Sequence, residues 1–309
     1  MKNKIKITVA GIGGVGGYFG GLLANRFYQK DGVEICFFAR GEHLKQIQKK
    51  GLKVIKGTTE FVAIPSLASD NASEIGIADF ILICTKSYDL ETVLLQLKPC
   101  IDSHTVLLPL LNGVDSTEII KGVLPTATVL DGCAYIVSSL KEPGVIENSG
   151  NIQTLYFGLN NKKTDKLVLL EEILRQATIE AILSDGISSI IWEKFIFISP
   201  TATATSYFNN CIGELLADEN KSKMLQLLIE EITQIAKSKG ILIDKEITAK
   251  TLNKLKSLPF ETTSSMHRDF KNHKKKTEVE SLTGYVVRAG QQLNILTPEF
   301  ERAYNQLRL

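Results

Sequence analysis

A glycine-rich segment near the start of the chain has the spacing that a nucleotide-binding turn requires. It reads Gly11-Ile12-Gly13-Gly14-Val15-Gly16 and follows the apolar run Ile5–Ala10. In a strand–turn–helix unit, the first glycine permits the tight turn, the second lets the backbone approach a pyrophosphate, and the third allows close helix–strand packing. The helix N-terminus then presents N–H groups to the anion. The segment predicts a dinucleotide site; the alternative is a tight turn without a ligand.

The residue after the next apolar run indicates which dinucleotide is bound. Sites for NAD usually place Asp or Glu at the end of the second strand, where the carboxylate holds the ribose 2′-hydroxyl. Here the run ends with Arg40 and Gly41, with no acid at its tip. A guanidinium can form charge-assisted hydrogen bonds to a 2′-phosphate. We therefore expect NADP(H), although Arg40 could also be a solvated surface residue.

Lys194 is the strongest candidate for proton transfer. It lies between the apolar stretches Ile190–Trp192 and Phe195–Phe197, where a charged side chain needs a partner or a function. A lysine can both donate a proton to a developing alkoxide and stabilise its charge, especially if burial lowers the lysine pKa toward neutrality. The alternative is an exposed helix lysine beside Glu193.

Other polar residues give weaker signals. Lys86 and Asn112 follow predicted strand ends, where ligands bind in open α/β sheets, but polar loop residues are common. A basic run could bind an anion, although a solvated loop is the more frequent explanation; it comprises Lys271, Lys274, Lys275 and Lys276. We expect His267 and His273 to be surface residues.

The elements that would position these residues change character along the chain. The first half alternates apolar strand candidates with helical segments, which predicts a doubly wound, mostly parallel sheet; the strand candidates are Ile5–Ala10, Glu34–Ala39, Phe80–Thr85, Thr105–Leu110, Val129–Val137 and Ile152–Phe157. From about Ser184 the pattern is helical, and Gly240 is placed to end one helix. We expect an NADP-binding α/β domain over residues 1–183 and an all-α substrate domain over 184–309.

Composition excludes several classes of protein. The 309 residues are 44% hydrophobic and carry a net charge of +2, which excludes a mainly disordered chain and gives no electrostatic reason to bind nucleic acid. The apolar runs are far shorter than the roughly 20 residues that span a bilayer. Five scattered cysteines and four histidines lack metal-ligand spacing. We expect a reduced, cytoplasmic protein with no metal, nucleic-acid or membrane partner; a homodimer is compatible with the sequence but not fixed by it.

Several strings together resemble one family, the 2-dehydropantoate 2-reductases, or ketopantoate reductases, of pantothenate biosynthesis. They are GIGGVGGYFG, ARGEHL, CTKSYDL, LLNGV, WEKF, GELL, SSMHRD and TEVESLTG, and their order and approximate spacing extend over nearly the whole chain. The resemblance implies a Rossmann-like N-terminal domain and an all-helical C-terminal domain like that of 6-phosphogluconate dehydrogenase. It also implies an active site in the cleft between the domains.

The resemblance assigns roles to individual residues. Lys86 matches a lysine near the cofactor ribose and nicotinamide, and Asn112 matches an asparagine that touches both cofactor and substrate. Lys194 matches the lysine that donates a proton to the substrate carbonyl. Ser265 matches a substrate-binding serine, and Glu278 matches the acid that helps position the lysine and the cofactor.

The chain departs from the family pattern at the substrate positions. Ile198, Ala202 and Ile212 stand where the family has substrate-binding asparagines, and Pro200 lies three residues earlier than usual. The interval from Ser265 to Glu278 is one residue longer than usual. On a helical wheel, Thr201 and Thr205 lie near the face of Lys194 and could supply replacement hydroxyls, or they could be capping or packing residues.

Three functions are compatible with these observations. The first is NADPH-dependent reduction of 2-dehydropantoate to (R)-pantoate. The second is reduction of another small 2-oxo acid or carbonyl compound in a less polar pocket, which the lost asparagines favour. The third is a catalytically silent NADP-binding sensor, which the presence of both Lys194 and Glu278 disfavours.

Overall fold

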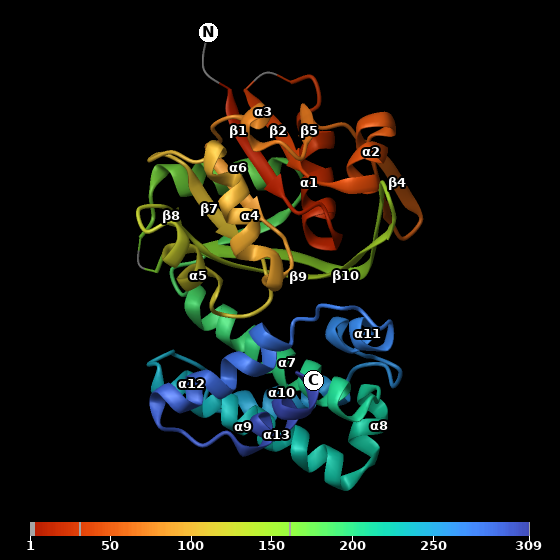
Figure 1. Ribbon diagram of the computed structural model, residues 1–309, viewed down its shortest axis with the longest axis vertical. Coiled ribbons are helices and arrows are strands. Elements are labelled where there is room, and N and C mark those ends of the chain that lie inside the picture. The colour runs from red at the N-terminus through yellow and green to blue at the C-terminus, as the bar shows by residue number, and fades with distance from the viewer. Residues whose placement is uncertain (1–3, 31, 161, 309) are drawn as a thin grey trace. The chain divides into compact units, whose positions relative to one another are not determined.

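The computed structural model describes residues 4–30, 32–160 and 162–308. The chain divides into two compact units (Figure 1). Unit 1 comprises the residues up to Leu111 together with Ser116–Ile187, and unit 2 comprises Asn112–Asp115 with Ser188–Leu309. The main division thus follows Ile187, whereas the sequence predicts it after residue 183. The short segment 112–115 leaves the first unit and belongs to the second.

Unit 1 is built on a six-stranded parallel sheet with the order β5-β2-β1-β6-β7-β8. The strands are β1 (Ile5–Ala10), β2 (Val33–Phe38), β5 (Leu67–Ser69), β6 (Phe80–Ile83), β7 (Val106–Pro109) and β8 (Thr128–Val129). The helices of this unit are α1 (Gly14–Phe27), α2 (Gly41–Lys50), α3 (Ala72–Ile75), α4 (Leu90–Leu97), α5 (Ser116–Val123) and α6 (Asp165–Gln176). The predicted parallel α/β domain is confirmed.

Burial on both faces of this sheet explains its unalternating apolar strands. In β6, Phe80 and Leu82 join one hydrophobic cluster, which includes α1 residues such as Phe19 and Leu23. Ile81 and Ile83 join the cluster on the opposite face, with residues of α3 and α4. A strand that is covered on both faces needs apolar residues at every position.

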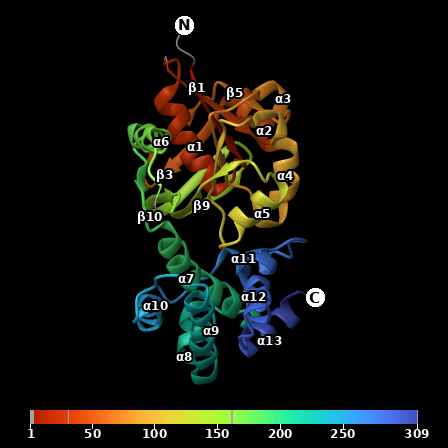
Figure 2. The same ribbon diagram turned by 90° about the vertical axis from the view of Figure 1, so that its left-hand side faces the viewer.

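A second sheet, which the sequence analysis does not separate from the first, covers α1. Its strands are β3 (Leu52–Lys56), β4 (Thr59–Ala63), β9 (Asp131–Glu142), β10 (Val145–Gly158) and β11 (Glu180–Leu183). Helix α1 contacts β9, β10, β3 and β4 as well as β1 and β2, and Figure 2 shows it beside β1 and β3. The turn at Pro143-Gly144 connects the antiparallel pair β9–β10, and Gly144 adopts a φ of +85°.

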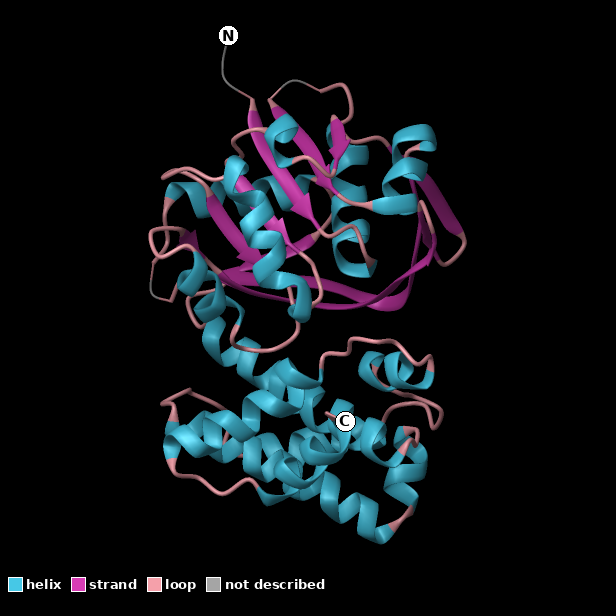
Figure 3. Cartoon of the chain, in the orientation of Figure 1, coloured by secondary structure: helices cyan, strands magenta, loops and turns pink. Residues whose placement is uncertain are grey.

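The regular secondary structure of unit 2 is all helical among its described residues, with loops between the helices (Figure 3). It contains α7 (Ile187–Phe208), α8 (Ile212–Ala217), α9 (Glu219–Ser238), α10 (Ile247–Lys256), α11 (Ser265–Lys271), a π-helical turn (Glu280–Gly284), α12 (Tyr285–Leu293) and α13 (Pro298–Leu307). The predicted all-α second domain is confirmed. Among the helices of the described residues, none is long and apolar enough to cross a membrane.

Candidate active site

The glycine turn joins β1 to α1 through contacts that exclude larger side chains. Gly11 has a φ of +90°, and a Cβ there would lie 2.9 Å from the backbone of Cys84 and of Thr85. A Cβ at Gly16 would lie 2.2 Å from Gly11 O and 2.7 Å from Cys84 Cβ. The chain can therefore turn tightly, and α1 can pack onto the end of β6, only because these positions are glycines.

The N-terminus of α1 leaves room for an anion. Gly13 is the N-cap, and a Cβ placed there would meet no atom within 4 Å among the described residues. The first turn of α1 contains no acidic residue, and the N–H of Gly17 donates the helix bond to Gly13 O at 2.7 Å. By helix geometry, the N–H groups before Gly17 lack intrahelical acceptors and can bind a pyrophosphate. The turn thus fits a dinucleotide.

Gly14 has a different role from the other glycines. A Cβ at this position would lie 2.3 Å from Ser138 O of β9. The second sheet therefore requires this glycine, whereas the sequence analysis interprets Gly14 only as part of a ligand-binding motif. Ser138 lies far along the chain, and no local pattern could reveal this contact.

Arg40 and Lys86 follow two strands that lie on either side of β1. Arg40 is the N-cap of α2 after β2, and Lys86 precedes a short 3₁₀ turn, Ser87–Asp89, after β6. The Arg40 side chain is 73% exposed, and its Nη2 lies 2.7 Å from Asp89 Oδ2. Arg40 is thus available to solvent at the end of the sheet but has a carboxylate partner.

Lys194 and Asn112 form a hydrogen bond within unit 2. Lys194 lies on α7 and is half-buried, and its Nζ donates to Asn112 Oδ1 at 3.1 Å. Asn112 follows β7, but its segment 112–115 belongs to the helical unit. The structure therefore brings together two residues that are separated by 82 positions in the sequence.

Glu278 precedes a helical turn that packs against the same segment. It is only 2% exposed, and Ser281 Oγ donates to its carbonyl oxygen at 3.2 Å. A Cβ at Gly113 would lie 3.6 Å from Ser281 O, which places the segment 112–115 against the helix that follows Glu278. The described residues therefore connect Lys194, Asn112 and the Glu278 region within one unit.

A π-helical turn after Glu278 is held by two hydroxyl residues of α7 that the sequence analysis misses. Ser199 Oγ donates to Leu282 O at 2.8 Å, and Thr203 Oγ1 lies 2.8 Å from Thr283 Oγ1. Single π turns often occur at functional sites. In the sequence, the signal for Ser199 and Thr203 was the presence of hydroxyl side chains within a predicted helix.

Ser265 is the first residue of α11, and its neighbour Ser264 caps this helix. Ser264 Oγ accepts from the His267 N–H at 3.0 Å and lies 2.8 Å from Thr205 Oγ1. The structure thus places Thr205, one of the predicted substrate residues, beside the start of α11. Ser265 itself is half-buried.

The hydroxyls of Thr201 and Thr205 bond to the backbone of their own helix. Thr201 Oγ1 donates to Phe197 O at 2.6 Å, and Thr205 Oγ1 lies 2.7 Å from Thr201 O. Thr205 is fully buried, with 0% exposure. This arrangement favours the packing alternative over the predicted substrate role.

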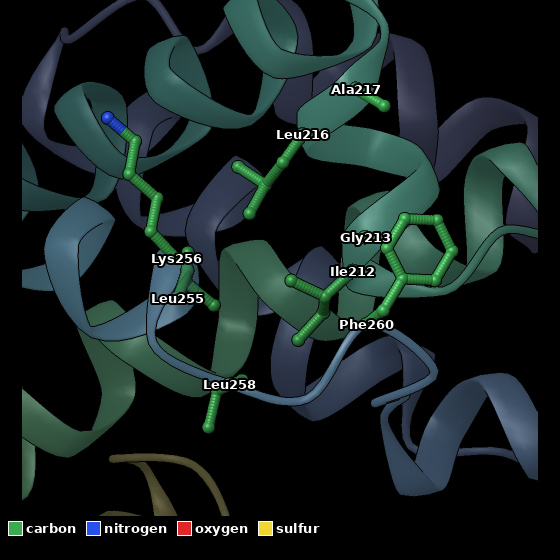
Figure 4. A pocket seen from close by; sticks show the side chains of 8 residues that line it. All are labelled: Ile212, Gly213, Leu216, Ala217, Leu255, Lys256, Leu258 and Phe260. Carbon is green, nitrogen blue, oxygen red and sulfur yellow. The ribbon is translucent and has the colours of Figure 1, made fainter.

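The three positions that replace asparagines lie in or against the hydrophobic core of unit 2. Ala202 and Ile212 belong to the hydrophobic core of unit 2, and Ile198 packs against that core. Ile212 also lines an apolar groove with Leu216, Leu255 and Phe260 (Figure 4). Helix α7 continues through Pro200.

Two further expectations concern the segment around α11. His267 is buried, so its prediction as a surface residue is wrong. Its Nε2 lies 2.8 Å from Asn209 Oδ1, and its Nδ1 forms a hydrogen bond with Thr263 Oγ1. Burial, followed by the charges of Lys271 and Arg268, lowers the His267 pKa.

The basic run from Lys271 to Lys276 is exposed, as expected for a solvated segment, and Lys274 Nζ lies 2.7 Å from Asp269 Oδ1.

A parallel sheet with a glycine turn, followed by a helical unit with a half-buried lysine, is typical of the dinucleotide-dependent oxidoreductases. Comparisons with known proteins narrow this class. Residues 7–162 match the family model "Ketopantoate reductase PanE/ApbA", and residues 186–309 match "Ketopantoate reductase PanE/ApbA C terminal". The chain therefore belongs to the ketopantoate reductase family. The predicted family and its oxidoreductase class are confirmed, and the family supports a nicotinamide cofactor.

The similarity to individual relatives extends over almost the full chain. "Uncharacterized oxidoreductase YkpB" of Bacillus subtilis is 32% identical over 99% of this chain and 98% of its own. The crystal structure of 2-dehydropantoate 2-reductase from Porphyromonas gingivalis W83 is 36% identical, with a TM-score of 0.87, and covers 99% of this chain and 100% of that one. D-mandelate dehydrogenase, solved with NADH and anilino(oxo)acetate, shares the fold, with a TM-score of 0.84 and 24% identity. The match covers 98% of this chain and 97% of that one.

Proposed function

We propose that the protein reduces a small 2-oxo acid with NADPH, and that the reaction is the conversion of 2-dehydropantoate to (R)-pantoate in pantothenate biosynthesis. The hydrogen bond from Lys194 Nζ to Asn112 Oδ1 at 3.1 Å is the observation that carries this proposal. This bond holds the half-buried ammonium of Lys194 next to Asn112, which lies in the family-like string LLNGV. The same unit also contains the buried Glu278. The relative from Porphyromonas gingivalis carries the name of this activity.

The residues of the chain divide the chemistry between them. When bound at the glycine turn, NADPH supplies the hydride. Lys194 Nζ donates a proton to the carbonyl oxygen of the substrate as negative charge develops there. Asn112 Oδ1 orients the ammonium by accepting one of its protons, and Glu278 positions the lysine. The Ser265 hydroxyl, at the start of α11, binds the substrate carboxylate.

A second candidate is reduction of a 2-oxo acid that lacks the terminal hydroxyl of 2-dehydropantoate. The bonds of Thr201 and Thr205 to helix carbonyls favour it, because those hydroxyls have used their donor protons within α7. A silent sensor is the least favoured function, since it needs neither Lys194 nor Glu278. The fold itself admits other acids, as the D-mandelate dehydrogenase complex with anilino(oxo)acetate illustrates.

Oxidation of NADPH in the presence of several 2-oxo acids tests these alternatives. The decisive quantity is the ratio of kcat/KM for 2-dehydropantoate to that for 3-methyl-2-oxobutanoate, which lacks the terminal hydroxyl. We expect poor discrimination, since a site without polar groups for that hydroxyl cannot reject the analogue strongly. A preference above about a thousandfold would show that the hydroxyl is recognised and would eliminate the second candidate. NADPH binding without turnover of any acid would support the sensor.

A further inference from the structure

An ion pair joins the segments that follow β2 and β6, at the edge of the sheet where the dinucleotide would bind. Arg40 follows β2, Asp89 follows β6, and Nη2 of the first lies 2.7 Å from Oδ2 of the second. The Arg40 side chain is 73% exposed, whereas the Asp89 side chain is 19% exposed. The carboxylate is therefore the more fixed partner, and the arginine reaches to it from the surface.

The sheet order places this pair across the end of β1. Strand β1 lies between β2 and β6, and the glycine turn begins directly after β1. Gly11 N–H bonds to Phe38 O of β2 at 3.1 Å, and Cys84 N–H bonds to Ala10 O at 2.8 Å, so the three strand ends are held together. In doubly wound sheets, ligands bind outside these carboxyl ends. The Arg40–Asp89 pair thus lies at the predicted adenosine end of the cofactor site.

The Asp89 carboxylate changes which group at the ribose 2′ position can bind beside Arg40. A phosphate monoester carries about −1.5 to −2 charges near neutral pH, so a 2′-phosphate at Arg40 would be repelled by Asp89 and would compete with it for the guanidinium. A ribose 2′-hydroxyl, in contrast, can donate a hydrogen bond to a carboxylate. Dinucleotide-binding folds use an acid at a strand end for this purpose.

We propose that Asp89 is a specificity-determining residue that weakens the preference for the 2′-phosphate, so that the protein binds NADH as well as NADPH. This inference rests on the proposed function in one respect, namely that a nicotinamide dinucleotide occupies the glycine turn. The acid comes from the segment between β6 and α4 rather than from the end of β2, which is why inspection of the second strand alone favours NADP(H). Arg40 retains its role toward a phosphate, but Asp89 lowers the net positive charge that the phosphate meets.

Equilibrium binding of the two cofactors to the full-length protein tests the proposal. Titration with NADPH and with NADH, followed by cofactor fluorescence, gives two Kd values for the native protein and for Asp89→Asn. We expect Asp89→Asn to tighten NADPH binding about three- to tenfold at low salt and to leave NADH binding unchanged or weaker. The gain for NADPH should shrink at high ionic strength.

Glu91→Gln is the matched control. Glu91 is an exposed acid in the first turn of α4, two positions after Asp89, so its neutralisation makes the same change in total charge. We expect Glu91→Gln to leave the ratio of the two Kd values unchanged. Within the described part of the chain, the Asp89 side chain forms no capping bond at α4, so the amide should not uncap this helix. Asp89→Ser provides a second neutral variant if Asp89→Asn does not fold.

The outcomes separate this proposal from the proposed function. An unchanged Kd ratio in folded Asp89→Asn would overturn the specificity role while leaving cofactor binding intact. Weaker NADPH binding in Asp89→Asn would also overturn it, because Asp89 would then orient Arg40 toward the phosphate. Failure of the native protein to bind either dinucleotide would overturn both proposals together.

Discussion

Flanking residues in the sequence predict the exposure and partner of a side chain to different degrees. The examples are Arg40, Lys194 and His267. Lys194 lies in an apolar stretch, and the structure gives it the partner that such a stretch requires, Asn112. Arg40 is exposed as a strand-end residue should be, but its partner Asp89 is 49 residues away. His267 is buried against Asn209, 58 residues away. Residue type therefore predicts a need for a partner, while the partner's identity depends on tertiary contacts.

Replacement of Arg40 should change affinity for one cofactor more than for the other. We expect Arg40→Ala to weaken NADPH binding at least about tenfold and NADH binding little, because the guanidinium can form about two charge-assisted bonds to a 2′-phosphate. The loss would be reinforced by Asp89, whose carboxylate would then face the phosphate without the Arg40 guanidinium beside it. Titration with each cofactor measures the effect, and an equal loss for both would show that Arg40 is structural.

At the scale of elements, the helical period and the apolar strands predict most of unit 1 and the helical nature of unit 2. The second sheet is harder to predict because β4 is largely exposed and β3 contains lysines, so neither has the apolar run of a buried strand. Pro200 lies inside α7, which extends from Ile187 to Phe208. Its ring removes one backbone hydrogen-bond donor from this helix.

The contact between α7 and α11 should stabilise the predicted substrate site. Thr205→Val keeps the shape of the side chain but removes the hydroxyl that bonds Ser264 and Thr201 O. We expect a loss of about 1 kcal/mol in the free energy of unfolding and a higher KM for the 2-oxo acid, with the Kd of NADPH unchanged. Thr205→Ser should restore both. A raised KM without any loss of stability would instead support direct contact between Thr205 and the substrate.

His267 should make stability depend on pH at the same contact. Burial, followed by Lys271 and Arg268, lowers its pKa from the ordinary value of 6.5, while Glu214 acts in the opposite direction. Between the lowered pKa and 6.5, the unfolded state binds more protons, so this contribution is complete above pH 6.5 and is lost as the pH falls through the lowered pKa.

His267→Gln isolates this contribution, because its amide can still donate to Asn209. Urea unfolding at several pH values between about 7.5 and 5 should give a smaller dependence on pH for the variant than for the native protein. His43, whose pKa is also lowered by burial, remains in both proteins and does not affect the difference. Identical pH profiles for the two proteins would contradict a role for His267.

At the scale of the whole molecule, the chain assigns its predicted functions to two units. The glycine turn and Arg40 belong to unit 1, whereas Lys194, Ser265 and Glu278 belong to unit 2. Asn112 interrupts this division, because its segment follows a strand of unit 1 but belongs to unit 2. A prediction that divides the chain at one boundary cannot find such a segment, since only contacts between distant residues define it.

The central claim is that Lys194 donates the proton in a reduction that uses NADPH. Its most direct test is the turnover of 2-dehydropantoate by Lys194→Ala, with NADPH affinity measured on the same preparation. We predict that NADPH binding is largely retained while kcat falls about a hundredfold or more, the scale expected for loss of a general acid, and that Glu278→Gln costs less. Near-normal kcat in Lys194→Ala would contradict the account and would assign the proton to another group or to water.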